Sequence, residues 1–90
     1  MRELRTKLYK LIEKKYKAGA LPVPKGNSHV KFLLNSVPWL LGEECTYSLI
    51  YMAYYILSFA GRCESVVAST FNPEDPAETI KKLIDIFSVI

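Results

Sequence analysis

A run of seventeen residues without a charged side chain, from Cys45 to Gly61, most constrains how this chain can fold. As a helix it is apolar on every side, so it must be surrounded by protein or by lipid. It would extend about 26 Å, which is shorter than the roughly 30 Å hydrocarbon layer of a membrane. Its tyrosines are spread along its length, whereas a membrane-spanning helix gathers them at its ends. We therefore predict a helix over residues 43–61 that lies at the centre of a bundle.

This predicted helix has three faces. Two are apolar: Cys45, Leu49, Met52, Ile56, Phe59 and Cys63 form one, and Thr46, Ile50, Ala53, Leu57 and Ala60 form the other. The third carries Tyr47, Tyr51, Tyr54 and Ser58, with Tyr55 beside it. Tyrosines suit a half-buried protein interface because the ring adds apolar area while the hydroxyl stays in water. They can also stack on unpaired bases, but a nucleic-acid platform mixes aromatic rings with cations, and this face has none. We predict that these tyrosines and Trp39 pack within the fold or against a partner.

Residues 2–18 have the spacing of a second helix. Its narrow apolar stripe consists of Leu4, Leu8, Leu11, Ile12 and Tyr16. On another face, Lys7, Lys10, Lys14 and Lys17 follow one another in steps of three, four and three, with Arg2, Arg5 and Lys15 nearby. Lysines along one helix face can follow a phosphate backbone, which predicts contact with nucleic acid. The alternative is the solvated side of an ordinary bundle helix. Gly19 comes after the last turn, where a left-handed C-cap is expected.

The other segments carry cap and turn signals. Residues 20–28 form a connection with two prolines, and Ser28 is the predicted N-cap of a short helix from His29 to Asn35 or Ser36. Pro38 suits the first turn of a further helix that begins after the short one. Residues 62–72 fit a longer central helix, a separate helix or an extended segment. The last helix is predicted to begin with Asp75 as its N-cap and Pro76 as its first helical residue. Glu78 is at the position of the carboxylate in a capping box. This helix has a stripe made of Ile80, Leu83, Ile84, Phe87 and Ile90.

The net charge of +3 hides an asymmetry along the chain. Residues 1–31 contain nine Lys or Arg and two acidic residues, for a net +7, whereas residues 32–90 have a net charge of −4. A basic N-terminal part and an acidic C-terminal part indicate binding to a polyanion, binding to an acidic protein surface, or head-to-tail self-association. Glutamine is absent while lysine, glutamate, isoleucine and tyrosine are plentiful, which is typical of thermophilic proteins.

No combination of residues indicates catalysis or a cofactor. His29 is the only histidine, and neither a second histidine nor a carboxylate lies three or four residues after it as a metal partner. Glu43 and Glu44 point about 100° apart on a helix, so capping explains them better than an acid–base pair. Cys45 and Cys63 would lie about 27 Å apart on one helix, too far for a disulfide. We expect no enzyme activity, no cofactor, no small-molecule substrate and no metal.

Taken together, these patterns predict one all-α domain over residues 1–90, a small bundle of four to five helices around the apolar helix 43–61. The function that fits best is a non-catalytic interaction subunit. It would self-associate or dock on a larger protein, as an accessory component of a nucleic-acid-processing assembly. One alternative is a basic nucleic-acid-binding protein that uses the lysine face of the first helix, and a second is a membrane-associated helical protein. The first ten residues lack the apolar core of a signal peptide, so we expect a cytoplasmic protein.

Overall fold

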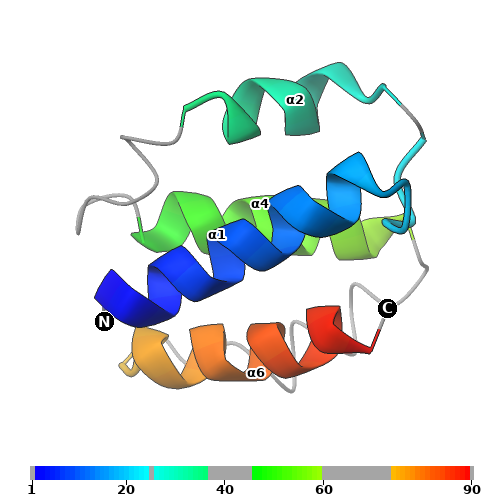
Figure 1. The fold of residues 1–90 in the computed structure, drawn as a ribbon. Coiled ribbons are helices and arrows are strands. Elements are labelled where there is room, and N and C mark those ends of the chain that lie inside the picture. Colours follow the sequence, from blue (N-terminus) through cyan, green and yellow to red (C-terminus); the bar gives the residue numbers. More distant parts are fainter. Residues whose placement is uncertain (1, 25, 37–45, 60–73, 90) are drawn as a thin grey trace.

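The computed structural model describes residues 2–24, 26–36, 46–59 and 74–89. These residues form four helices and no strand: α1 (Arg2–Lys17), α2 (Ser28–Leu34), α4 (Thr46–Ser58) and α6 (Pro76–Ser88). Helix α1 crosses in front of α4, with α2 above the pair and α6 below it (Figure 1). Helix α4 packs against α1, α2 and α6, and α1 packs against α6. The predicted small all-helical bundle is confirmed, while the central position of the whole segment 43–61 stays a prediction.

Helix α1 ends at a glycine with a left-handed backbone, as predicted. Gly19 has a φ of +69°. Its N–H donates to the carbonyl of Tyr16 at 3.1 Å, and the N–H of Ala20 donates to that of Lys15 at 2.9 Å. This pair of bonds is the Schellman motif, which satisfies carbonyls that have no donor within the helix.

Helix α6 begins as its local sequence predicts. Asp75 is the N-cap, Pro76 is the first helical residue, and the Asp75 carboxylate accepts a hydrogen bond from the N–H of Glu78 at 3.2 Å. The predicted stripe is buried at its four described positions, namely Ile80, Leu83, Ile84 and Phe87. On the other side of the helix, Lys81, Lys82 and Asp85 are exposed.

The predicted N-cap of α2 is wrong by one residue. Asn27 is the cap, because its side-chain oxygen accepts a hydrogen bond from the N–H of Val30 at 3.0 Å, and Ser28 is already helical. Asparagine and serine are equally good caps. The amide of Asn27 also donates to the hydroxyl of Tyr55 at 3.2 Å, and this contact with α4 fixes Asn27 in the capping position.

Both apolar faces of α4 are buried in the core. Leu49, Met52 and Ile56 represent the first face, and Ile50, Ala53 and Leu57 the second. They pack with Leu8 and Ile12 of α1, Val30 and Leu34 of α2, and the buried residues of α6. Phe59 is an exception, since it follows the end of α4, is 43% exposed and lies against the edge of Tyr55.

The buried side of α1 is wider than its predicted apolar stripe. Arg5, which we expected beside the lysines, is only 2% exposed and donates to the side-chain oxygen of Thr46 at 3.3 Å. Tyr9 is buried as well, and its hydroxyl donates to the carbonyl of Leu34 at 2.6 Å. The placement of Arg5 on the lysine side is therefore wrong, because its helical position faces α4. The predictions for Trp39, Pro38, Glu43, Glu44, both cysteines, residues 62–72 and Ile90 lie outside the described residues.

Candidate functional site

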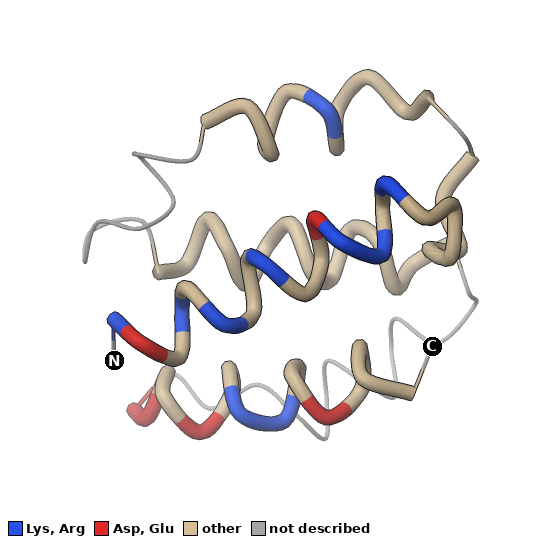
Figure 2. Tube along the Cα trace, viewed as in Figure 1, with Lys and Arg blue, Asp and Glu red and all other residues tan. Residues whose placement is uncertain are grey.

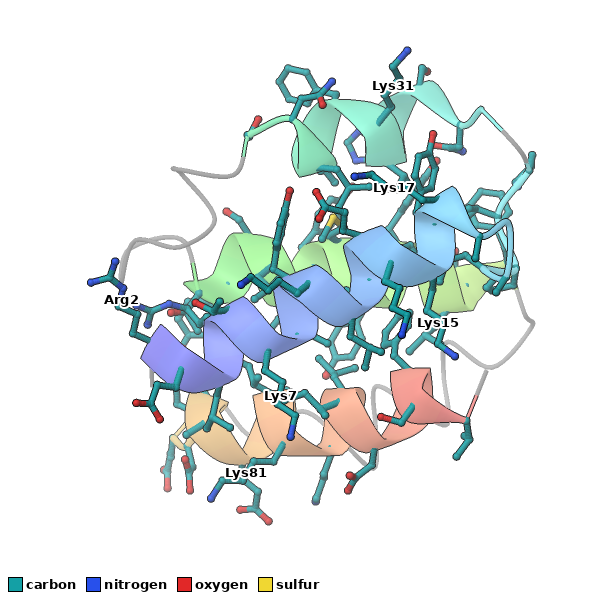
Figure 3. All side chains as sticks on the ribbon, viewed as in Figure 1. Arg2, Lys7, Lys15, Lys17, Lys31 and Lys81 are labelled. Carbon is teal, nitrogen blue, oxygen red and sulfur yellow. The ribbon has the colours of Figure 1, made fainter. Side chains whose placement is uncertain are left out.

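The first candidate site is the outer side of α1. Lys7, Lys10, Lys14 and Lys17 are all exposed, on the side of the helix opposite Leu8 and Ile12, and they form the lysine surface. Figure 2 shows basic residues repeating along the whole of α1. In Figure 3, Lys7 extends toward α6 and Lys17 toward α2, so the charges spread across the front of the bundle.

The lysine surface keeps most of its positive charge. Among the described residues, none of its four lysines has a carboxylate within ion-pair distance. The salt bridge between described residues lies on α6, where it joins Lys82 to Glu78. Glu3 is exposed in the first turn, and Glu13 is half-buried. Helix α1 has more basic residues than these two acidic ones, so its net charge is positive. The arrangement suits electrostatic contact with a polyanion.

The second candidate site is the third face of α4. Tyr47 is 53% exposed and Tyr51 is 54% exposed, while Tyr54 and Tyr55 are half-buried. The other two faces of the same helix are buried, so α4 is enclosed by its own chain on only part of its circumference. Packing within the fold therefore leaves two of the predicted interface tyrosines open to solvent. Large apolar rings that remain exposed side by side are a common mark of an interaction site.

Helix α2 adds to this face. The ring of His29 lies edge-on to Tyr55, with centroids 4.7 Å apart, and edge-on to Tyr51 at 5.9 Å. Tyr51 and Tyr55 are stacked at 6.4 Å, and Phe59 meets Tyr55 edge-on at 5.3 Å. The aromatic surface consists of His29, Tyr47, Tyr51, Tyr55 and Phe59. All of these rings except that of Tyr47 restrict one another's orientation, since edge-on and offset arrangements are the favoured ones.

Sequence reasoning missed the contributions of His29 and Phe59 to this surface. It also missed Phe32, which is 67% exposed and lies one helical turn after His29. The signal was present in α2, because His29 and Phe32 are three residues apart and both lie off the stripe of Val30 and Leu34 that enters the core. His29 therefore extends the aromatic surface from α4 onto α2, whereas among the described residues no ring contact joins Phe32 to it.

The two surfaces lie on opposite sides of the bundle. Helix α1 turns its buried side toward α4 and α6, so its lysines point away from α4. Helix α4 turns its two buried faces toward α1 and α6, so its exposed tyrosines point away from α1. Figure 1 shows α1 directly in front of α4, which makes these the two outer sides of one helix pair. A ligand on one surface leaves the other free.

A groove of about 520 Å³ lies at the carboxyl end of α1. Its lining consists of Tyr16, Lys17, Ala18, Gly19, Leu21, Val23, Pro24 and Gly26. The side chains of these described residues are mostly apolar or absent, and they include no pair of a nucleophile and a base.

Within the described ranges, no three His, Cys, Asp or Glu side chains lie together as ligands for a metal ion. None of the described helices is long and apolar enough to cross a membrane. In comparisons with known proteins, no family model, no curated protein and no solved structure matches this chain. The proposals below therefore depend on the two surfaces alone.

Proposed function

We propose that the protein is a non-catalytic interaction subunit that binds protein through its aromatic surface. The observation that supports this most directly is the exposure of Tyr47 and Tyr51 on a helix whose other two faces are buried. Tyrosine is enriched at the centres of protein interfaces, where it contributes large apolar contacts at low entropic cost. The buried faces already stabilise the bundle, so the exposed face is available for a partner.

The ring contacts of the aromatic surface favour binding. His29 restricts the rings of Tyr51 and Tyr55, and the hydrogen bond from Asn27 restrains the Tyr55 hydroxyl. Side chains that are already ordered lose little rotamer freedom when a partner arrives. The surface is thus largely prepared for contact before binding.

The test is capture of a partner by the immobilised chain from an extract of its source cells. Three forms are compared: the wild type, the double variant Tyr47→Ser/Tyr51→Ser, and the matched double variant Lys10→Ser/Lys14→Ser on the opposite side. We expect a protein that the wild type and the lysine variant retain and the tyrosine variant loses. Equal retention by all three forms would show that the aromatic surface is not the binding site.

A second function, nucleic-acid binding by the lysine surface, is favoured by the exposure of its four lysines and by their lack of ion pairs with described carboxylates. Four phosphate contacts on a duplex give a salt slope near −3.6, so affinity should fall about 100-fold between roughly 50 and 200 mM salt. The two functions are compatible, because an accessory subunit could hold protein on one side and nucleic acid on the other.

This second function is tested by fluorescence anisotropy with labelled duplex and single-stranded DNA and RNA. Lys10→Glu/Lys14→Glu should abolish binding, whereas Lys81→Glu/Lys82→Glu, an equal charge change on α6, should weaken it far less. Equal loss in both variants, or affinity that does not change with salt, would contradict it. Binding to anionic vesicles without binding to nucleic acid would instead favour the membrane-associated alternative.

A further inference from the structure

We infer that a second copy of this chain covers the aromatic surface, so that the protein forms a dimer with α4 against α4. This inference rests on the proposed function and identifies its partner. It follows from three properties of the surface: its charge, its distance from the lysine surface and its area.

The charge of the aromatic surface is compatible with a copy of itself. Residues 46–59 contain no Lys, Arg, Asp or Glu, and His29 is the one ionisable base among the rings. Two copies that met through α1 would bring lysines together and repel one another. Two copies that meet through α4 place neutral surface against neutral surface. A strongly acidic or basic partner gains no ion pair from this face.

Pairing through α4 also keeps the lysine surfaces apart. Each lysine surface is on the far side of α1 from α4, so the dimer would stack α1, α4, the partner's α4 and the partner's α1. Four helix diameters of about 10 Å separate the two lysine surfaces by about 40 Å. Screening at physiological salt acts within about 8 Å, so their repulsion is negligible. Such a dimer carries two outward lysine surfaces, one for each of two polyanion segments.

The exposed area predicts how strong the dimer is. An aromatic side chain buries roughly 150–250 Å², so the exposed parts of Tyr47, Tyr51 and Phe59 offer about 300 Å². The half-buried Tyr54 and Tyr55 raise this to about 400 Å² for each copy. Two copies together bury about 800 Å², which is below the roughly 1,000 Å² of a stable specific interface. We therefore expect a weak, reversible dimer with a dissociation constant of about 100 μM.

A two-fold dimer uses the same surface twice, and this symmetry identifies the residue to change. Tyr51 is one helical turn from both Tyr47 and Tyr55, so it lies in the middle of the surface and close to the two-fold axis. A Tyr51→Glu substitution places two carboxylates near that axis, where they repel each other and lose water. The single substitution thus changes the interface in both copies.

The test is sedimentation equilibrium of the purified chain over a range of concentrations. We expect a monomer–dimer equilibrium for the wild type, at least tenfold weaker dimerisation for Tyr51→Glu, and a change of no more than about twofold for Lys14→Glu on the opposite side. Near-ultraviolet circular dichroism checks that the variants are folded, as the exposure of Tyr51 predicts. Dilution of the wild type followed by NMR locates the interface without any substitution. Concentration-dependent shifts in α2 and α4 support the dimer, and shifts centred on α1 or α6 overturn it.

The two proposals fail in different ways. If the wild type remains a monomer up to about 0.5 mM while a different protein is captured only when Tyr47 and Tyr51 are intact, the dimer is wrong and the proposed function stands. If a dimer forms and Tyr51→Glu leaves it unchanged, the aromatic surface is not its interface, and the dimer through α4 is wrong. If no protein binds the aromatic surface and the chain is a monomer, both proposals are wrong.

Discussion

Tyr9 joins α1 to the end of α2 and allows a precise test of the packing. Its buried hydroxyl donates to the carbonyl of Leu34 at 2.6 Å, and the carboxylate of Glu13 is a second acceptor at 3.3 Å. The Leu34 carbonyl belongs to the last turn of α2, where no donor within the helix is available. Tyr9→Phe keeps the ring and removes this donor. An unsatisfied buried carbonyl costs about 1–3 kcal/mol, and we expect the free energy of unfolding to fall by that amount at neutral pH.

The same residue makes stability depend on alkaline pH. Burial, the negative charge of Glu13 and the hydrogen bond to its carboxylate together raise the pKa of Tyr9 from 10 to about 12, and burial contributes most. In the unfolded chain the tyrosine ionises near pH 10, so between about pH 10 and 12 the unfolded state has lost a proton that the folded state retains. Stability from this group is complete below about pH 10 and is lost as the pH rises to 12. Two pKa units correspond to at most about 2.7 kcal/mol.

Urea unfolding of wild type and Tyr9→Phe at pH values from about 8 to 12 measures both effects. The wild type should be more stable at pH 8, and the difference between the two proteins should shrink above pH 10, because phenylalanine does not ionise. Tyr51→Phe is the control, since its exposed hydroxyl should contribute almost nothing at pH 8. A difference that stays constant from pH 8 to 12, or equal stability at pH 8, would refute this account of the Tyr9 hydroxyl.

Three further substitutions test the bundle, with thermal or urea unfolding as the measurement. Leu57→Ala should cost about 2–5 kcal/mol because the side chain is fully buried, whereas Ser58→Ala beside it should change stability by less than about 0.5 kcal/mol. Ala53→Leu should cost about 1–3 kcal/mol by overpacking, and an unchanged stability would contradict close contact at this position. Gly19→Ala should cost about 1 kcal/mol through its left-handed backbone alone, since no atom lies within 4 Å of the added methyl group.

Helix ends were predictable where local chemistry alone decides them. Gly19 ends α1 and Asp75 begins α6 as expected, because each cap needs only neighbouring backbone groups. The start of α2 was not, since Asn27 and Ser28 are equivalent as caps. The bond from Asn27 to Tyr55, 28 residues later, decides between them. The local sequence does not predict a helix start where two adjacent residues are equally good caps and a tertiary contact decides between them.

The faces of α4 were predictable, but their environments were not. Helical periodicity separated Leu49 and Leu57 from Tyr51 correctly, because it depends only on the turn angle of the helix. Which face stays exposed depends on where α1, α2 and α6 pack, and the spacing of residues within α4 carries no information about that. Tyrosine adds to the difficulty, because its ring is stable in a core and its hydroxyl is stable in water.

The prediction for Arg5 was wrong because it gave more weight to the residue type than to the position of the residue on the helix. It precedes Leu8 and Tyr9 by three and four residues, so helical geometry places it on their side of α1. We grouped it with the lysines because arginine is rarely buried. Burial of its guanidinium requires an acceptor from elsewhere in the fold, and Thr46, 41 residues later, supplies one. Position along the helix was therefore the better guide, and a polar residue that shares a face with core residues predicts a distant partner.

The aromatic surface also depends on contacts between distant segments, which explains why sequence reasoning found its tyrosines but not its other two rings. His29 was weighed as a metal ligand or a base, since those are the roles that a lone histidine suggests. In the fold its ring packs edge-on against Tyr51 and Tyr55. The surface exists because α2 lies beside α4, and periodicity within either helix reports only that helix. An aromatic pair such as His29 and Phe32 that lies off the core stripe of a short helix is therefore better compared with the exposed faces of its neighbours than with motifs of catalysis.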